Sequence, residues 1–246
     1  MRRTSGGQLF LHVHVPKTAG TTINRILSEA LGAGSHVLHD HVLQPVDELQ
    51  RVVAESNWLA GHVPVDRALD AIKDDPREHI VLCGLREPKF HVISHYNWLI
   101  EIGCRGEQFF EDHPQRIKEV HHDIKSTDKT DPDAVIRTLQ RYDTLFLNSQ
   151  VKYVIGNRWS DISLSYKYEL DQYDMILTSK EEVFSFASSL LGEGASSFEE
   201  NRSDMHFDPA VFDTPQMLEF LADRNRADEA LWRIVQHRKS RKRELS

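Results

Sequence analysis

The chain has few cysteines and no long hydrophobic run. Only Cys83 and Cys104 occur among 246 residues, so no disulfide framework is expected and a reducing compartment fits the composition. No apolar stretch approaches the length of a membrane-spanning helix, and the run that starts at Leu9 is too short for the core of a secretory signal. These absences predict a soluble, cytoplasmic protein with no stable membrane insertion.

Basic residues are in the minority. The chain has 30 Lys and Arg against 38 Asp and Glu, which gives a formal net charge of −8. An acidic chain is a poor general partner for nucleic acids, although a local basic cleft can exist within it. The basic run at 237–243 is interpreted as a solvated helix end in a basic C-terminal tail at about 237–246. No nucleic-acid partner is therefore expected.

Histidines are numerous, with 14 in the chain, and raise the question of a metal site. His91 and His95 have the spacing of a zinc-binding H-E-x-x-H helix, but Val92 replaces the glutamate. His12 and His14 share one face of an expected strand and are interpreted as core or supporting residues. No histidine pair comes with the carboxylates of a ligand framework, so no metal is expected.

Strands and helices are predicted to alternate along the chain, which favours an α/β fold with a parallel sheet covered on both faces. Hydrophobic periodicity predicts strands at about 8–15, 58–61, 80–85 and 173–179, and helices at about 20–31, 46–54, 64–73, 88–100, 131–142, 179–192 and 218–235. The segment at about 104–131 is charged, His-rich and weakly periodic, and is expected to be a variable surface excursion or lid. A single domain over 1–246 is the economical interpretation.

The first strand runs into a small, hydroxyl-rich turn at 16–22 that opens a helix. Unpaired N–H groups at a helix start attract an anion. Gly20 allows close backbone approach, Lys17 adds a charge, and the threonine hydroxyls can donate hydrogen bonds. The turn is not a Walker loop, because Lys17 precedes the glycine instead of following a second one. It predicts a phosphate or sulfate site.

A second anion-binding element follows the strand at 80–85. Arg86 stands at its end, and a guanidinium suits bidentate contact with phosphate, although alone it fits a structural ion pair equally well. Ser94 lies about two helical turns further on and reaches the same anion only if the ligand lies along the helix. Pro88 suits the first turn of that helix.

Together these elements resemble the PAPS-dependent sulfotransferases, especially the carbohydrate sulfotransferase-like branch and its bacterial relatives. Pro16–Thr22 resembles the loop P-K-[TS]-[GA]-[GS]-[TS]-[TS], which grips the 5′-phosphosulfate of 3′-phosphoadenosine 5′-phosphosulfate (PAPS). Residues 86–96 match R-[DE]-P-x(5)-S-x-Y, which binds the 3′-phosphate of that cofactor. Weaker matches are Gly61-His62, residues 148–156 against N-x-Q-x-[RK]-x-[LV]-x-G, and Asn201-Arg202-Ser203. The resemblance spans about 8–236, interrupted at 104–131.

The resemblance implies a P-loop-like three-layer α/β/α fold and transfer of a sulfuryl group from PAPS to an acceptor hydroxyl. It implies that Lys17 and His62 are catalytic, with His62 as the general base. The implied cofactor-binding residues are Pro16, Lys17, Thr18, Ala19, Gly20, Thr21, Thr22, Arg86, Ser94 and Arg202. Ala19 replaces a glycine found in many members, which a negative φ would tolerate. The family base varies between histidine and glutamate, which leaves Glu87 or a glutamate in the segment 104–131 as another candidate.

Two other functions remain open. A P-loop-like ATP-dependent kinase or phosphotransferase predicts a magnesium-binding carboxylate, and the position of Lys17 argues against it. A non-catalytic nucleotide-binding module is disfavoured because both Lys17 and a candidate base are present. For a sulfotransferase, a saccharide, lipid or small natural-product acceptor is expected, because an acidic protein repels a highly sulfated polymer.

Overall fold

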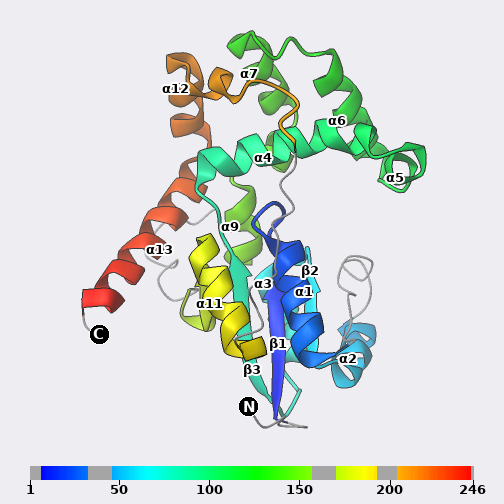
Figure 1. Cartoon of the computed structure of the whole chain (residues 1–246), viewed down its shortest axis with the longest axis vertical. Coiled ribbons are helices and arrows are strands. Elements are labelled where there is room, and N and C mark those ends of the chain that lie inside the picture. The colour runs from blue at the N-terminus through cyan, green and yellow to red at the C-terminus, as the bar shows by residue number, and fades with distance from the viewer. Residues whose placement is uncertain (1–6, 33–45, 157–169, 193–203, 245–246) are drawn as a thin grey trace. The chain divides into compact units, whose positions relative to one another are not determined.

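The computed structural model describes residues 7–32, 46–156, 170–192 and 204–244, and its chain forms two compact units (Figure 1). The first, called the sheet unit, comprises Met1–Arg86, Gln150–Glu200 and Arg233–Ser246. The second, called the helical unit, comprises Glu87–Ser149 and Asn201–Trp232. Both units combine separated segments of the chain. The prediction of one sulfotransferase-like domain stays a prediction.

The sheet unit contains a four-stranded, all-parallel sheet in the order β2-β1-β3-β4. Its strands are β1 (Gln8–Val13), β2 (Trp58–Gly61), β3 (Glu78–Gly84) and β4 (Met175–Leu177). Val13 is in register with Gly61 of β2 and with Cys83 of β3, so the carboxyl ends of these three strands are neighbours. The predicted α/β class with a parallel sheet is confirmed.

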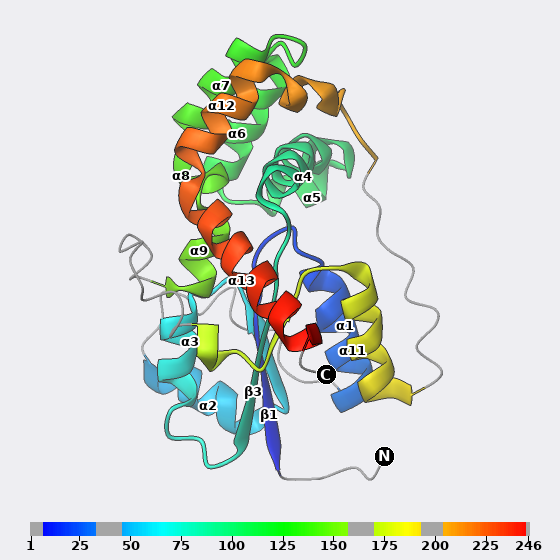
Figure 2. The same ribbon diagram turned by 90° about the vertical axis from the view of Figure 1, so that its left-hand side faces the viewer.

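Helices lie on both faces of the sheet (Figure 2). On one face, α1 (Gly20–Leu31) and α11 (Lys180–Leu191) share a buried cluster with Phe10 and Leu82. On the other face lie α2 (Val46–Glu55) and α3 (Val65–Ile72). Because both faces are covered, β1 is apolar almost throughout and its alternating side chains enter two different cores. This layering agrees with the α/β/α expectation.

The order of the strands reverses beside β1. The chain passes from β1 to β2 on one side and then places β3 on the other side of β1. In an open parallel sheet, ligands bind outside the carboxyl ends of the strands at such a switch point. The segments that follow β1, β2 and β3 are therefore candidate ligand-binding segments.

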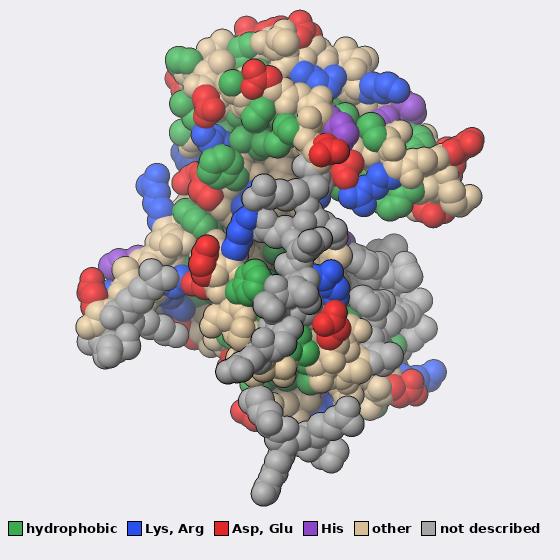
Figure 3. Space-filling model, in the orientation of Figure 1, with side chains coloured by type: hydrophobic (Ala, Val, Ile, Leu, Met, Phe, Trp, Pro, Cys, Tyr) green, Lys and Arg blue, Asp and Glu red, His purple; other side chains and the backbone are tan. Residues whose placement is uncertain are grey.

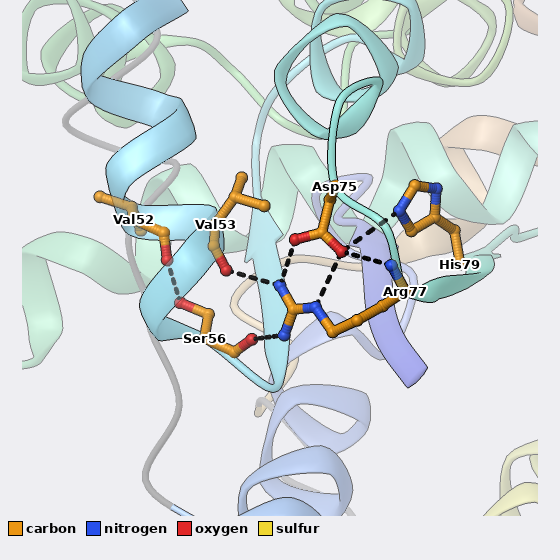
Figure 4. A network of polar contacts seen from close by, with 6 residues as sticks. All are labelled: Val52, Val53, Ser56, Asp75, Arg77 and His79. Carbon is orange, nitrogen blue, oxygen red and sulfur yellow. Dashed lines mark hydrogen bonds and ion pairs between the residues drawn. The ribbon is translucent and has the colours of Figure 1, made fainter. Parts of the chain in front are cut away.

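An arginine clamp anchors the turn before β3 (Figure 4). The Arg77 guanidinium donates to the carbonyl oxygens of Val53 at 2.8 Å and Ser56 at 2.5 Å, at the end of α2. The same guanidinium pairs with Asp75 at 2.6 Å and holds the pKa of that carboxyl down at about 2. The last carbonyls of a helix have no intrahelical partner, so the clamp satisfies α2 and fixes it to the start of β3.

The described part of the helical unit is built of helices around a second core. They are α4 (Pro88–Glu101), η1 (Ile102–Cys104), α5 (Glu107–Glu111), α6 (Gln115–Ser126), α7 (Pro132–Arg141), α8 (Asp143–Phe146), η5 (Pro209–Asp213), α12 (Pro215–Arg224) and the first part of α13 (Arg226–Glu244). Tyr96, Phe146 and Phe212 are fully buried in this core. Their rings lie 6.0 Å apart, from Tyr96 to each of the other two.

The segment 104–131 is not the irregular surface excursion expected from its composition. It contains α5 and α6, and Val120 and Ile124 of α6 are fully buried in the helical core. Ile117, Val120 and Ile124 give one apolar residue per turn, a narrow stripe among charged residues. That stripe is enough to bury one edge of a helix, but it falls below the width that signals an amphipathic helix in sequence.

The predicted long C-terminal helix at 218–235 is two helices, α12 and α13, interrupted at Asn225. The Asn225 carboxamide accepts the backbone N–H of Asn148 at 2.6 Å. In return, the Asn148 carboxamide accepts the N–H of Ala227 at 2.9 Å, in the first turn of α13. This reciprocal exchange of hydrogen bonds between segments distant in sequence breaks the helix.

The basic segment at 237–243 belongs to α13, where His237, Ser240 and Arg241 are exposed, as expected for a solvated helix end, whereas Arg238 and Lys239 are half-buried. Arg238 pairs with Asp171 at 2.9 Å, and Lys239 pairs with Glu182 and donates to the Thr178 hydroxyl at 2.9 Å. On the face seen in Figure 3, acidic and basic side chains of the described residues are interspersed. Among the described residues, no helix combines the length and apolarity needed to cross a membrane.

Candidate functional site

Three of the predicted elements leave the sheet from adjacent strand ends. The turn at 16–19 follows β1, His62 follows β2 directly, and Arg86 comes two residues after β3. The N–H of His14 donates to the Gly61 carbonyl at 3.0 Å, and that of Leu85 to the Leu177 carbonyl of β4 at 2.8 Å. These bonds continue the sheet pairing beyond the strands, so the three elements start from a rigid edge.

The turn after β1 has an unusual backbone. Lys17 has φ 64° and Ala19 has φ 66°, both in the left-handed region. The negative φ that would have made Ala19 a harmless replacement for glycine is absent, and each such residue carries about 1–2 kcal/mol of strain. The Ala19 carbonyl accepts the N–H of Ile23 at 3.0 Å and so begins α1. The first-turn N–H groups then face the turn without an intrahelical acceptor, which suits an anion.

The threonine at the centre of the turn has a structural bond. The buried Thr18 hydroxyl donates to the Val15 carbonyl at 2.8 Å, so its proton is engaged within the turn. Thr21 is exposed and Thr22 is half-buried, at the start of α1. Of the predicted hydroxyl donors, those of Thr21 and Thr22 therefore fit an anion better than that of Thr18.

Two glycines let the turn pack closely. A Cβ on Gly20 would lie 1.9 Å from Nε2 and Cδ2 of His14, so the imidazole rests directly on the first residue of α1. A Cβ on Gly84 would lie 2.2 Å from the Thr18 carbonyl oxygen. The turn after β1 therefore packs against Gly84, the last residue of β3, which lies two residues before Arg86. The structure brings the lysine turn and the Arg86 backbone to one place.

His62 is held in a defined tautomer. Its Nδ1 lies 2.7 Å from the His14 carbonyl oxygen. A carbonyl only accepts, so Nδ1 carries the proton and donates, and Nε2 is the basic nitrogen of the neutral ring. The ring centroid lies 4.3 Å from that of His14 and 6.1 Å from that of Tyr153, whose pKa is raised by burial. This arrangement suits a general base at the carboxyl edge of the sheet.

Next to His62, the rings of His12 in β1 and of His14, which directly follows β1, form a stack. The rings of His12 and His14 are 5.2 Å apart and nearly parallel. Nδ1 of His12 lies 2.6 Å from Oδ1 of Asn24, which fixes its proton there. Burial lowers the pKa of His12 to about 4, against the opposing effect of that hydrogen bond. His12 is therefore neutral at physiological pH. Both His12 and His14 are buried, in agreement with their interpretation as core residues.

Arg86 is exposed, but its backbone is held on both sides. The Arg86 N–H donates to Oε1 of Gln150 at 2.9 Å, and Nε2 of Gln150 donates to the Arg86 carbonyl at 2.9 Å. Gln150 is 2% exposed and lies on α9 (Ser149–Val154). A single buried side chain thus fixes the main chain from which the predicted 3′-phosphate ligand projects.

Glu87 and Pro88 have local roles in starting α4. The Glu87 carboxylate accepts the N–H of Phe90 at 3.1 Å as the N-cap, and Pro88 occupies the first turn. This capping bond disfavours Glu87 as the alternative base. Ser94 is half-buried on α4 and belongs to the helical unit, whereas Lys17, His62 and Arg86 belong to the sheet unit. Arg202 lies outside the described residues.

Sequence reasoning assigned no role to Gln150, Asn24 or Tyr153. Gln150 stood in the 148–156 motif, and its position there was the available signal. Gly156, at the end of the same motif, has φ 74°, and a Cβ on it would lie 2.6 Å from the Asp66 carboxylate. Asn24 and Tyr153 lie in ordinary helical sequence that carries no signal of its own.

The described residues contain no group of three or more His, Cys, Asp and Glu side chains arranged to hold a metal ion. No protein-family model, curated protein or solved structure matches this chain.

Proposed function

We propose that this chain is a PAPS-dependent sulfotransferase of the carbohydrate sulfotransferase-like branch, with a P-loop-like fold. The observation that carries the proposal is the convergence of the lysine turn, His62 and the Arg86 backbone at adjacent ends of β1, β2 and β3. The sequence motifs alone predict that these three elements bind the cofactor or act in catalysis. Their meeting at a switch point of the sheet supports a ligand with an anion at each end.

The residues fit the two ends of such a cofactor. The N-terminus of α1, with Pro16 to Thr22, would hold the 5′ end, and Lys17 would lie toward the transferring group. Arg86 would hold the 3′-phosphate. Contributions of Ser94 and Arg202 to that phosphate are proposed from the sequence motifs alone. PAPS, when bound, supplies the sulfuryl group and leaves adenosine 3′,5′-bisphosphate. His62 would accept the acceptor hydroxyl proton at Nε2, while Nδ1 stays bonded to the His14 carbonyl.

The acceptor is proposed to be a saccharide, lipid or small natural-product hydroxyl. The net charge of −8 disfavours a highly sulfated polymer. The cytoplasmic compartment also stays a proposal, from the two cysteines, both of which are free.

Calorimetry with adenosine 3′,5′-bisphosphate and with ATP, each with and without Mg²⁺, tests the proposal. We expect metal-independent binding of the bisphosphate, and transfer of labelled sulfate from PAPS to at least one acceptor in a screen of these three classes. Lys17→Ala should retain the fold and lose transfer. Magnesium-dependent ATP binding without bisphosphate binding would instead identify a kinase or phosphotransferase. Bisphosphate binding with no transfer to any acceptor would favour a binding module.

A further inference from the structure

Gln150 completes the carboxyl edge of the sheet at Arg86. Pairing between backbones reaches Leu85, whose N–H bonds to Leu177. At the next residue, the Gln150 carboxamide takes the place of a neighbouring strand by accepting the Arg86 N–H and donating to the Arg86 carbonyl. The bridge links residues 64 positions apart in sequence.

The two-sided bond requires an amide. A carboxamide has both an acceptor oxygen and a donor nitrogen, whereas a carboxylate of the same size only accepts and an apolar side chain does neither. Gln150 is nearly fully buried, so removal of its carboxamide leaves the Arg86 N–H and carbonyl without this partner. The Arg86 main chain would then lose both of the hydrogen bonds that Gln150 makes to it.

The helix that carries Gln150 is itself anchored in the sheet unit. The Tyr173 hydroxyl donates to the Val154 carbonyl of α9 at 3.0 Å, in a buried contact. Val151 and Val154, on the same helix as Gln150, are fully buried. The carboxamide is therefore presented to Arg86 from a fixed support, and a fixed support is what an exposed guanidinium needs in order to meet a phosphate at a defined angle.

We infer that Gln150 is a positioning residue that sets the preference of this site for nucleotides with a 3′-phosphate, by holding the Arg86 backbone. The inference rests on the proposed function, because it takes Arg86 as the ligand of that phosphate. Gln150 itself touches the protein main chain, and its effect on the nucleotide passes through Arg86.

The test compares the affinity of the full chain for adenosine 3′,5′-bisphosphate and for adenosine 5′-monophosphate, which lacks the 3′-phosphate. The wild type should prefer the bisphosphate by about 10- to 100-fold, as expected for charge-assisted hydrogen bonds to one phosphate. Arg86→Ala should abolish most of this preference. Gln150→Met should reduce it to about 3-fold or less, and the double variant should lose nothing further, because both changes act on one contact.

Tyr173→Phe is the matched control. It removes a buried hydrogen bond to the same helix but leaves the Arg86 bridge, so it should lower stability and keep the nucleotide preference. If Gln150→Met does not fold, Gln150→Glu keeps the size and the acceptor and loses the donor. It should show an intermediate preference.

The outcomes separate the two claims. A wild type with no preference for the bisphosphate would overturn the proposed function, and this inference with it. A wild-type preference that survives in Gln150→Met or is unchanged in Gln150→Glu would overturn the inference alone. If Tyr173→Phe loses as much of the nucleotide preference as Gln150→Met, Gln150 acts through general stability. That result would also overturn the inference.

Discussion

The imidazole of His14 occupies the space that a side chain on Gly20 would need, with Nε2 1.9 Å from the position of a Cβ. The ring is buried, stacked on that of His12 and tilted against that of His62, so it has little room to move aside. Gly20 is thus required by the histidine stack as well as by any anion. This relationship joins the turn that carries Lys17 to the support of the candidate base.

Gly20→Ala should destabilise the protein by about 1–3 kcal/mol, since the new methyl group overlaps the His14 ring. Chemical denaturation measures the change. Gly7→Ala, where no atom lies within 4 Å of the new Cβ, is the control and should be nearly neutral. A second His14→Ala change should recover part of the loss. Additive effects in the double variant would contradict the contact.

Ala19→Gly should stabilise the fold by about 0.5–1 kcal/mol. Glycine removes about 1–2 kcal/mol of left-handed strain and costs about 0.4–1 kcal/mol in unfolded-state entropy. Ala30→Gly, in the last turn of α1, should instead destabilise by about 0.5–1 kcal/mol. Denaturation midpoints of the two variants should therefore move in opposite directions. Movement in the same direction would argue against strain at residue 19.

Asp75→Asn should cost about 2–3 kcal/mol of stability, because it weakens the paired Arg77 clamp between α2 and β3 (Figure 4). The pKa of Asp75 is depressed to about 2 by Arg77. Its stabilising contribution is therefore present above pH 4 and is lost as the pH falls toward 2. The free energy of unfolding of the variant should therefore fall less steeply than that of the wild type between about pH 4 and pH 2. Asp70→Asn, exposed on α3, should change stability by less than about 0.5 kcal/mol.

His12 should make the protein less stable as the pH falls from about 6.5 to 4. Burial depresses its pKa in the folded state to about 4, so the unfolded chain binds a proton first across this window. The loss amounts to about 3 kcal/mol at the acid end. His12→Gln should flatten the pH dependence of the unfolding free energy, whereas His237→Gln, exposed on α13, should leave it unchanged. An unaltered slope in His12→Gln would contradict a buried neutral ring.

His62→Asn separates the structural role of His62 from its role as a base. The Asn amide can still donate to the His14 carbonyl in place of Nδ1, but it lacks the basic Nε2. Turnover should fall by about 100-fold or more, with cofactor affinity and melting temperature close to wild type. Steady-state kinetics and thermal unfolding supply the two readouts. Turnover near wild type would exclude His62 as the base.

Much of the architecture follows from local patterns. The strand at 58–61 and the start of α4 after Arg86-Glu87-Pro88 are found where the sequence predicts them, because burial on both sheet faces and proline at a helix start leave strong local signals. Predictions were wrong where a distant partner decides the outcome. The break at Asn225 depends on Asn148, and the burial of α6 depends on a core supplied by other helices.

Of the candidate site, the sequence by itself determined the chemical types and their order: a lysine turn after one strand, a histidine after the next and an arginine after the third. Tertiary structure alone decided that adjacent strand ends bring these segments together, that the His14 carbonyl selects the His62 tautomer, and that Gln150 holds the Arg86 backbone. The physical reason is that hydrogen bonds to a main chain can be made by any residue with a suitable donor or acceptor. The motif at 148–156 contains Gln150, but only the folded chain identifies Arg86 as the partner of its carboxamide.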